Sequence, residues 1–198
     1  MRLPLTSLVS MTSEPTHEVR NSLIDPVRSF RLLDDRLLWQ EAGSQRERRY
    51  ADITSVHLIA YPGYGGQPLQ CTLTDRDGKK IKIRSHSYVS LGNFQDRTAT
   101  YGPWIRALLA NLEAKGHGVG FYYGSNIMRA VWSTLFWLSV LVLVGYMFAL
   151  IGGAGRSVGT IAPMAFVAVF LPVSWLMIRQ NRPGTFDPKS PPPQMLGM

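Results

Sequence analysis

Cysteine is almost absent from this chain, which has Cys71 as its single thiol among 198 residues. One cysteine excludes an intramolecular disulfide and any metal centre built from several cysteines, and it agrees with a reducing compartment. An apolar run is also missing from the N-terminal segment, MRLPLTSLVSMTSEPTHEV, which holds one Arg and lacks the core of a signal peptide. We therefore expect residues 1–27 to form a disordered leader.

Charged residues are absent from two long segments, residues 130–151 and residues 158–178. As helices of 22 and 21 residues, each would span about 30 Å, the thickness of the hydrocarbon core of a bilayer. The alternative is a pair of buried helices in a soluble protein. That alternative is disfavoured because core helices rarely stay uncharged for this length, and two of them need a larger domain to cover them. The sequence therefore predicts two transmembrane helices.

The distribution of basic residues around these segments predicts their orientation. Only six residues connect the two segments, so the predicted helices form an antiparallel hairpin. The connection contains one basic residue, Arg156, whereas the outer flanks carry Arg129, Arg179, Arg182 and Lys189. Because Lys and Arg concentrate on the cytoplasmic side of a membrane, we expect a multi-pass protein of the bacterial inner membrane with both termini in the cytoplasm.

Small residues mark one face of each predicted membrane helix. Gly145, Ala149 and Gly153 recur at every fourth position of the first helix and its end, and the second helix carries Ala162 and Ala165. Faces of this kind let two helix backbones approach closely. They seat either the other helix of the hairpin or a separate membrane subunit. The tethered helix is the favoured partner because its local concentration is high.

The whole chain is basic, with a formal net charge of +8 and a pI near 9.9. Residues 1–127 hold 16 Lys and Arg against 12 Asp and Glu, so much of the basic excess lies beside the apolar segments. This distribution favours contact with an anionic cytoplasmic leaflet over nucleic-acid binding, which requires a basic face on one domain. We expect membrane lipids as partners, together with another membrane or membrane-associated protein, and no nucleic acid.

Alternation of apolar and polar residues before the apolar segments predicts short antiparallel strands. The expected strands cover residues 29–33, 36–41, 46–50, 52–61, 69–74 and 79–84. Asp34 and Asp35 form the turn of the first hairpin, and Asp77 with Gly78 forms the turn of the last hairpin.

The last of these strands has the pattern of a strand that is buried on one side. Ile81 and Ile83 face one side of it, and Lys80, Lys82 and Arg84 face the other side.

A helix follows the strands and ends near Gly116. Its apolar stripe consists of Tyr101, Ile105, Leu108 and Leu112, at the spacing that lets one helix face cover a sheet. Pro103 is expected in the first turn of this helix, where its missing N–H costs nothing.

Strands followed by one amphipathic helix resemble the pleckstrin-homology-like (PH-like) domains of bacterial membrane proteins. The resemblance covers residues 28–115 and lies in the RSFRLL and RLLWQE hairpin, the YADITSVHL strand, the LTDRDGKKIKI hairpin and the YGPWIRALLANL helix. It implies an α+β fold, a curved antiparallel sheet or barrel closed by a C-terminal helix, which we place at residues 28–124. Relatives that bind phosphoinositides carry a basic motif in the first hairpin loop. In this chain the first hairpin loop carries the acidic Asp34 and Asp35. The resemblance therefore does not imply phosphoinositide binding.

The densest basic cluster lies on and beside the last predicted strand. It consists of Arg76, Lys79, Lys80, Lys82 and Arg84. Such a cluster contacts anionic lipid headgroups or an acidic partner, or it is an ordinary solvated strand face. The solvated face is favoured because two aspartates, Asp75 and Asp77, interrupt the cluster.

The sequence offers no catalytic motif, metal site or cofactor site. His57 and His86 lack the companion ligands of a metal centre. Cys71 lies in an apolar strand, which indicates a packed thiol. The glycines near residue 65 lack the Lys-Ser/Thr of a phosphate loop.

Without catalytic residues, we expect a non-enzymatic membrane-anchored adaptor or scaffold. The alternative is an accessory or assembly subunit of a larger inner-membrane complex. Residues 179–198, which are rich in proline, are expected to form a disordered tail.

Overall fold

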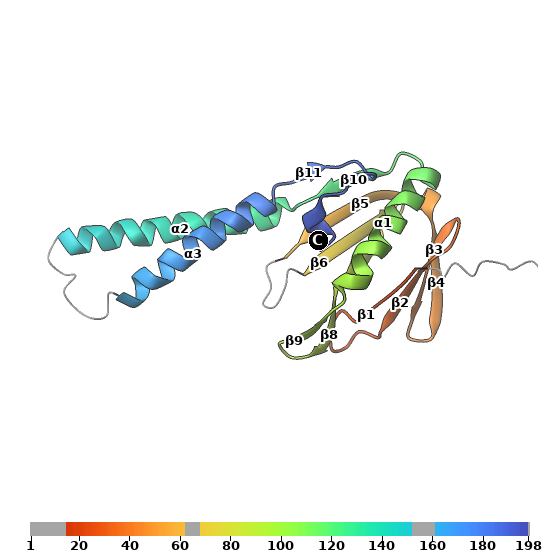
Figure 1. The fold of residues 1–198 in the computed structure, drawn as a ribbon, viewed down its shortest axis with the longest axis horizontal. Helices are drawn as coiled ribbons and strands as arrows, with labels where there is room; N and C mark the ends of the chain where they lie inside the picture. The colour runs from red at the N-terminus through yellow and green to blue at the C-terminus, as the bar shows by residue number, and fades with distance from the viewer. Residues whose placement is uncertain (1–14, 62–67, 152–160, 198) are drawn as a thin grey trace, which may run out of the picture.

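The computed structural model describes residues 15–61, 68–151 and 161–197. Within these ranges the chain forms a mixed α+β domain from which two long helices project side by side, as Figure 1 shows. The expected α+β class is confirmed.

Four antiparallel strands form the first sheet, in the order β1-β2-β3-β4. Their bounds are Thr16–Val19 for β1, Arg28–Leu32 for β2, Arg36–Glu41 for β3 and Ser44–Arg49 for β4. The expected hairpin of β2 and β3 is confirmed, with Leu32 opposite Leu37 across the turn. Strand β1 lies inside the segment that was expected to be disordered, so that expectation is wrong for residues 16–19. The reason is that Val19 and His17 point into the core and are buried there.

The second sheet has the order β11-β10-β5-β6-β7. Its strands are Ile53–Ala60 (β5), Leu69–Asp75 (β6), Lys80–Arg84 (β7), Gly120–Tyr123 (β10) and Gly184–Thr185 (β11). Strand β10 runs parallel to β5, and the other neighbours are antiparallel. In β7, Ile83 is buried while Lys80 and Lys82 are exposed, which confirms the predicted register.

A third element, the hairpin of β8 (His86–Ser90) and β9 (Asn93–Asp96), precedes helix α1 (Thr98–Lys115). The predicted apolar stripe of α1 is buried, and Trp104 and Leu109 extend it. The helix begins earlier than expected because the Asp96 carboxylate accepts a hydrogen bond from the Thr98 N–H at 2.7 Å. Pro103 therefore lies in the second turn and not in the first.

Both sheets and α1 enclose one hydrophobic core. Within the described residues the strands do not close into a barrel, because a short 3-10 turn, Tyr50–Asp52, separates β4 from β5 and places them in different sheets. An ion pair joins the sheets instead: Arg48 of β4 lies 3.0 Å from the buried carboxylate of Asp75 in β6.

The two projecting helices are α2 (Asn126–Ile151) and α3 (Ile161–Gln180). They contact through aromatic pairs, with 6.1 Å between the rings of Trp132 and Phe170, and through small buried residues. Ser139 and Ser174 are both buried at this contact, and each hydroxyl donates to the carbonyl four residues earlier in its own helix. The first predicted span, residues 130–151, lies within α2. The second predicted span begins at residue 158, outside the described residues, and overlaps α3 from residue 161 onward.

The C-terminal segment returns to the domain, so the expected disorder of residues 179–198 is wrong for the described part of that segment. Phe186 packs on Phe121, with 5.7 Å between the ring centroids, and Lys189 forms an ion pair with Glu113 at 3.0 Å. Met195 and Leu196 are buried in the core, and the carbonyl group of Leu196 lies beside Gly102 in the first half of α1. A proline-rich composition indicates low helix content, but it does not prevent a few apolar side chains from docking.

Candidate functional site

Strand connectivity decides which end of the second sheet adjoins the helix pair. Strand β10 is parallel to β5, and α2 begins three residues after Tyr123, the last residue of β10. The C-terminal end of β5 is therefore the end nearest the helices. Because β5, β6 and β7 alternate in direction, the C-terminal end of β7 is also close to the helices, and the β6–β7 turn lies at the opposite end.

The five predicted basic residues are consequently spread along the sheet. Arg84 is at the helix end, whereas Arg76 and Lys79 are in the β6–β7 turn at the far end. Lys80 and Lys82 lie between these ends on the outer face of β7 and are exposed. The row runs along the sheet, from the far end toward the helices.

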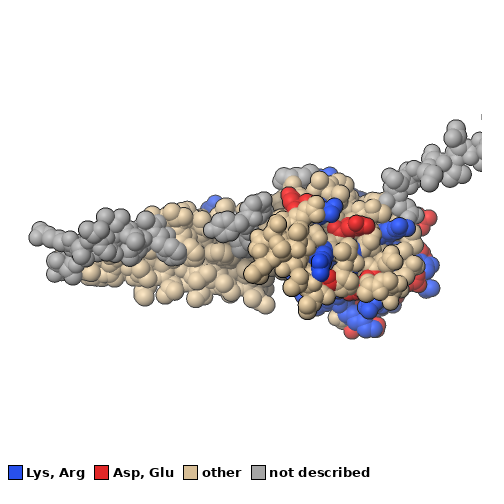
Figure 2. All heavy atoms as spheres, turned by 90° about the horizontal axis from the view of Figure 1, so that it is seen from below, with Lys and Arg blue, Asp and Glu red and all other residues tan. Residues whose placement is uncertain are grey.

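Two of these five side chains are engaged within the domain. The Arg84 guanidinium donates to Gln70 Oε1 at 3.1 Å and to the carbonyl of Asn21 at 3.3 Å. The Arg76 guanidinium donates to the carbonyl of Ala51 at 2.9 Å. These two arginines therefore hold neighbouring segments in place, and the exposed lysines supply the positive charge of the face. Basic and acidic groups are interspersed on the side of the domain seen in Figure 2, while the helix pair there is almost free of charge.

A shallow hollow lies beside this face, where the sheet meets the base of the helix pair. Its lining includes His57, Thr72, Lys80, Tyr122 and Asn126. The imidazole Nε2 of His57 lies 2.5 Å from the carbonyl oxygen of Gly124, so the ring ties β5 to the residues that lead into α2. This contact makes His57 a structural residue of the junction and leaves Lys80 as the charged group of the hollow.

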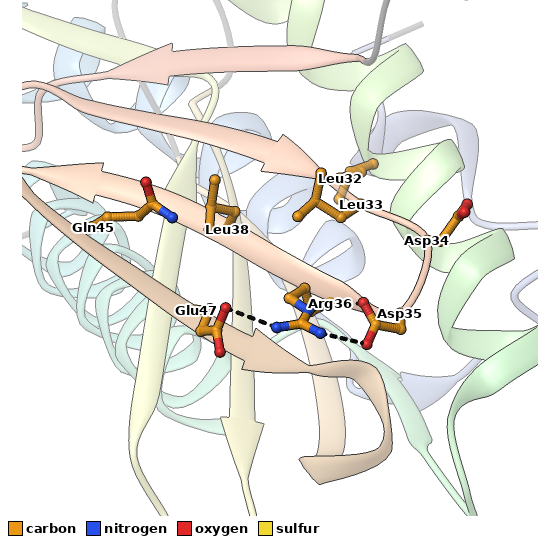
Figure 3. Close-up of a pocket in the computed structure, with 8 residues that line it drawn as sticks. All are labelled: Leu32, Leu33, Asp34, Asp35, Arg36, Leu38, Gln45 and Glu47. Atoms are coloured by element: carbon orange, nitrogen blue, oxygen red, sulfur yellow. Dashed lines mark hydrogen bonds and ion pairs between the residues drawn. The ribbon is translucent and has the colours of Figure 1, made fainter.

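A second hollow lies at the β2–β3 turn (Figure 3). In Figure 1 the strands β2 and β3 lie on the side of the domain away from the helix pair. Arg36 lies between two acids there, with its guanidinium 2.8 Å from Asp35 and 3.0 Å from Glu47. This pairing lowers the pKa of the Asp35 carboxyl and raises the pKa of Arg36. Arg36 is the one basic residue in the lining of this hollow, against the three carboxylates of Asp34, Asp35 and Glu47, so the hollow keeps a net negative charge.

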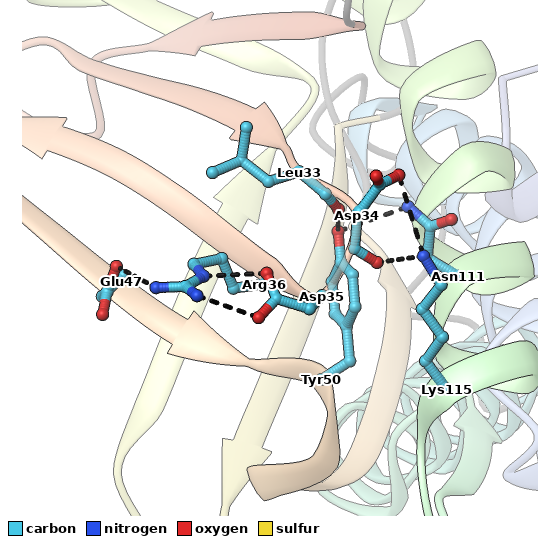
Figure 4. A network of polar contacts seen from close by, with 8 residues as sticks. All are labelled: Leu33, Asp34, Asp35, Arg36, Glu47, Tyr50, Asn111 and Lys115. Carbon is cyan, nitrogen blue, oxygen red and sulfur yellow. Dashed lines mark hydrogen bonds and ion pairs between the residues drawn. The ribbon is translucent and has the colours of Figure 1, made fainter.

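The same turn is fastened to α1 by the contacts drawn in Figure 4. Tyr50 donates its hydroxyl to the carbonyl of Leu33 at 2.9 Å, and Asn111 donates to the Tyr50 oxygen at 3.3 Å. Lys115 donates to the carbonyl oxygen of Asp34. Burial raises the pKa of Tyr50 to about 12, so this phenol stays protonated and serves as a fixed link.

Cys71 and His86, which the sequence singled out, have structural contacts. Cys71 is fully buried, and burial raises the pKa of its thiol, so the expectation of a packed thiol is confirmed. His86 Nδ1 lies 2.9 Å from the hydroxyl of its neighbour Ser85. In the parts of the chain that the structure describes, no three His, Cys, Asp or Glu side chains gather as a metal site.

The small-residue face of α2 is open. Gly145 and Ala149 are exposed, and no described atom lies within 4 Å of the position that a Cβ on Gly145 would occupy. The described contact of α2 with α3 uses the face of Ser139 instead. Gly153 lies outside the described residues, and so do the side chains of Ala162 and Ala165. The prediction that this face packs against a helix therefore stays a prediction.

Comparison with protein-family models, with curated proteins and with solved structures finds no match for this chain.

Proposed function

We propose that this chain is a non-enzymatic, membrane-anchored adaptor of the bacterial inner membrane. In this proposal α2 and α3 cross the bilayer as a hairpin, both termini lie in the cytoplasm, and the α+β domain is PH-like and binds a protein partner or the membrane surface.

The observation that carries the anchoring proposal is the exposed apolar surface of α2. Among the described residues, the segment Asn126–Ala149 is the one helix long and apolar enough to cross a membrane. Large apolar side chains such as Trp137, Leu141 and Phe148 are exposed on it. Exposure of this much apolar surface to water is unfavourable, by about 25 cal/mol per Å². A bilayer covers it, and it also covers the apolar α3 beside it.

Support for an adaptor comes from the junction between the helices and the domain. Residues on both sides of the helix pair enter the same sheet, as the adjacent strands β10 and β11. The N–H of Gly124 donates to the carbonyl of Leu58 at 2.9 Å, and the N–H of Ser125 donates to the carbonyl of Asn181 at 3.2 Å. A helix pair held in this way fixes the orientation of the domain relative to a bilayer, which suits a protein that presents one surface to a partner.

Support for a PH-like domain comes from the order of its elements. Between residues 28 and 115, strands β2 to β7 come first along the chain, the β8–β9 hairpin follows, and the helix α1 that covers the core comes last. The resemblance noted for the sequence implies antiparallel strands followed by one C-terminal helix. Phosphoinositide binding is not part of the proposal, because the β2–β3 turn carries Asp34 and Asp35.

The labelling of introduced cysteines tests the topology, because the native Cys71 is buried and should not react with a maleimide. Gly155→Cys, in the connection outside the described residues, should react with a membrane-impermeant maleimide in intact spheroplasts. Asp77→Cys, in the β6–β7 turn, should react only after lysis. Labelling of the Asp77→Cys chain in intact spheroplasts would reverse the proposed orientation. Release of the full chain from membranes by carbonate would refute the proposal that α2 and α3 cross the bilayer.

An accessory subunit of a membrane complex is the second candidate, and the open face around Gly145 favours it. Photo-cross-linking in cells separates the two candidates. An adaptor should cross-link to a protein from the exposed Gln40 or Gln45 of the first sheet. A subunit should cross-link to a membrane protein from the exposed Val142 or Ala149 of α2.

A further inference from the structure

Two neighbouring loops of the domain expose large apolar side chains. Leu91, at the tip of the β8–β9 hairpin, is 95% exposed, and Ile24, between β1 and β2, is 91% exposed. Together with four apolar neighbours that are more than half exposed they form a surface that we call the apolar rim. The rim consists of Leu23, Ile24, Val27, Val89, Leu91 and Phe94.

Each loop is built so that its apolar residues point outward. The guanidinium of Arg20 donates to the carbonyl of Asp25 at 2.9 Å and also to the carbonyl of Leu23, so it closes the first loop beneath its own apolar residues. In the hairpin, Gly92 has a φ of +75°, which lets the chain turn immediately after Leu91. Both loops are therefore held in shape by their own polar contacts.

The two loops are also fastened to each other. The N–H of Tyr88 donates to the carbonyl of Arg20 at 2.8 Å, and the N–H of Arg20 donates to the hydroxyl of Ser87 at 3.0 Å. The apolar rim is thus one surface, although its halves are about 70 residues apart in the sequence.

The apolar rim lies at the end of the domain from which the helices leave. The hairpin follows directly on the C-terminal end of β7, the end nearest the helices, and Arg84 at that end donates to the carbonyl of Asn21 in the first loop. In Figure 1 the tip of the β8–β9 hairpin points to the side of the helix pair and reaches about the level at which α2 begins. A bilayer around α2 would have its headgroup region at this level, because Arg129 lies in the first turn of α2.

We propose that the apolar rim inserts into the interfacial region of the bilayer that holds α2 and α3. This inference rests on the proposed membrane anchoring. The rim would give the domain a second membrane contact, displaced from the helix pair, and two contacts fix the tilt of the domain on the membrane. Apolar side chains at the ends of loops suit this role because they reach the acyl boundary while the backbone stays at the headgroups.

Depth-dependent quenching tests the inference on the full chain, reconstituted in liposomes of phosphatidylethanolamine and phosphatidylglycerol. Leu91→Cys carries an environment-sensitive NBD label at the rim. Asp77→Cys in the β6–β7 turn is the control at the far end of the domain. Leu141→Cys, which is 70% exposed near the middle of α2, reports the anchor. Lipids with a doxyl group at a shallow or a deep acyl position serve as quenchers.

We expect shallow doxyl lipids to quench the Leu91→Cys label several-fold more strongly than the Asp77→Cys label, and deep doxyl lipids to quench the Leu141→Cys label. Equal quenching of the Leu91→Cys and Asp77→Cys labels, with the Leu141→Cys label quenched, would overturn the rim contact and leave the anchor in place. An unquenched Leu141→Cys label would overturn the anchor and the rim contact together.

A second variant tests whether the loops act as one surface. Adding Ile24→Asp to the Leu91→Cys chain should reduce shallow quenching, because the charged loop would lift the hairpin away from the acyl boundary. Gln40→Asp, on an exposed position of β3, is the matched control for charge and should leave quenching unchanged. Equal quenching in both double variants would contradict a shared insertion.

Discussion

The docking of the C-terminal segment into the core leads to a measurable prediction. Leu196 is 2% exposed, and its carbonyl group lies directly beside Gly102 in α1. The N–H of Leu196 donates to the carbonyl of Pro193 at 3.0 Å, and the N–H of Met195 donates to the carbonyl of Pro192 at 2.9 Å, so both amides report whether the segment is in place. Leu196→Ala removes three carbon atoms from this buried position.

The magnitude follows from the buried carbon atoms. At about 0.8 kcal/mol per carbon the transfer loss is about 2–3 kcal/mol, and any cavity that does not collapse adds to it. The loss is felt first by the segment, because residues after β11 can leave the core without unfolding the sheets. An effect of about 2–3 kcal/mol corresponds to a roughly 30- to 150-fold increase in the population of the detached segment.

Hydrogen exchange followed by mass spectrometry measures this population in the full chain in detergent. Leu196→Ala should accelerate exchange at Met195 and Leu196 by about the same factor as the population of the detached segment increases. Gln194→Ala is the matched control, since this exposed residue belongs to the same turn, Pro193–Met195. Equal exchange in the two variants would refute the docking of Leu196.

Three further predictions concern the domain. Ile83 is fully buried and Lys82 is exposed on the same strand, so Ile83→Asp should cost several kcal/mol and Lys82→Asp little, and equal thermal stability would contradict the register. Asp75→Ala removes the partner of Arg48 and should lower the free energy of unfolding, measured in urea, by about 2–3 kcal/mol. Asp77→Ala, at an exposed position, should lower it by less than about 0.5 kcal/mol. Burial lowers the pKa of His17 below its ordinary value of 6.5, although its hydrogen bond to the carbonyl of Arg84 opposes this. The unfolded chain then binds the proton more readily, so the contribution of His17 to stability is complete above pH 6.5 and is lost as the pH falls from there toward the lowered pKa. Melting temperatures recorded against pH should fall less steeply for His17→Gln below that pH, and unchanged steepness would refute this role.

Much of the fold was predictable because it depends on local pattern. Alternation over five to eight residues is enough to identify β3, β5 and β7, and helical spacing from Tyr101 to Leu112 identifies α1 and its buried face. Length and lack of charge identify the apolar segment of α2 from residue 130 onward. These features are specified by residues close together in the sequence, so no knowledge of distant partners is needed.

Strands β1, β10 and β11 were not predictable in the same way. They have two to four residues, too few for a period to be recognised, and they exist because a free sheet edge accepts them. Gly184 pairs with Tyr123 only after the helix pair has brought the two segments together. The burial of Leu196 likewise depends on a place in the core that α1 and the sheets form jointly.

The candidate sites show the same division. Alternation in the sequence places Lys80, Lys82 and Arg84 on one face of a strand. Only the tertiary structure decides that Arg84 is engaged by Gln70 and Asn21, while the two lysines stay exposed. The apolar rim has no sequence signal of its own, because isolated apolar residues in loops are common and unremarkable singly. It becomes one surface through the hydrogen bonds of Arg20 with Ser87 and Tyr88, which join loops that the sequence keeps far apart.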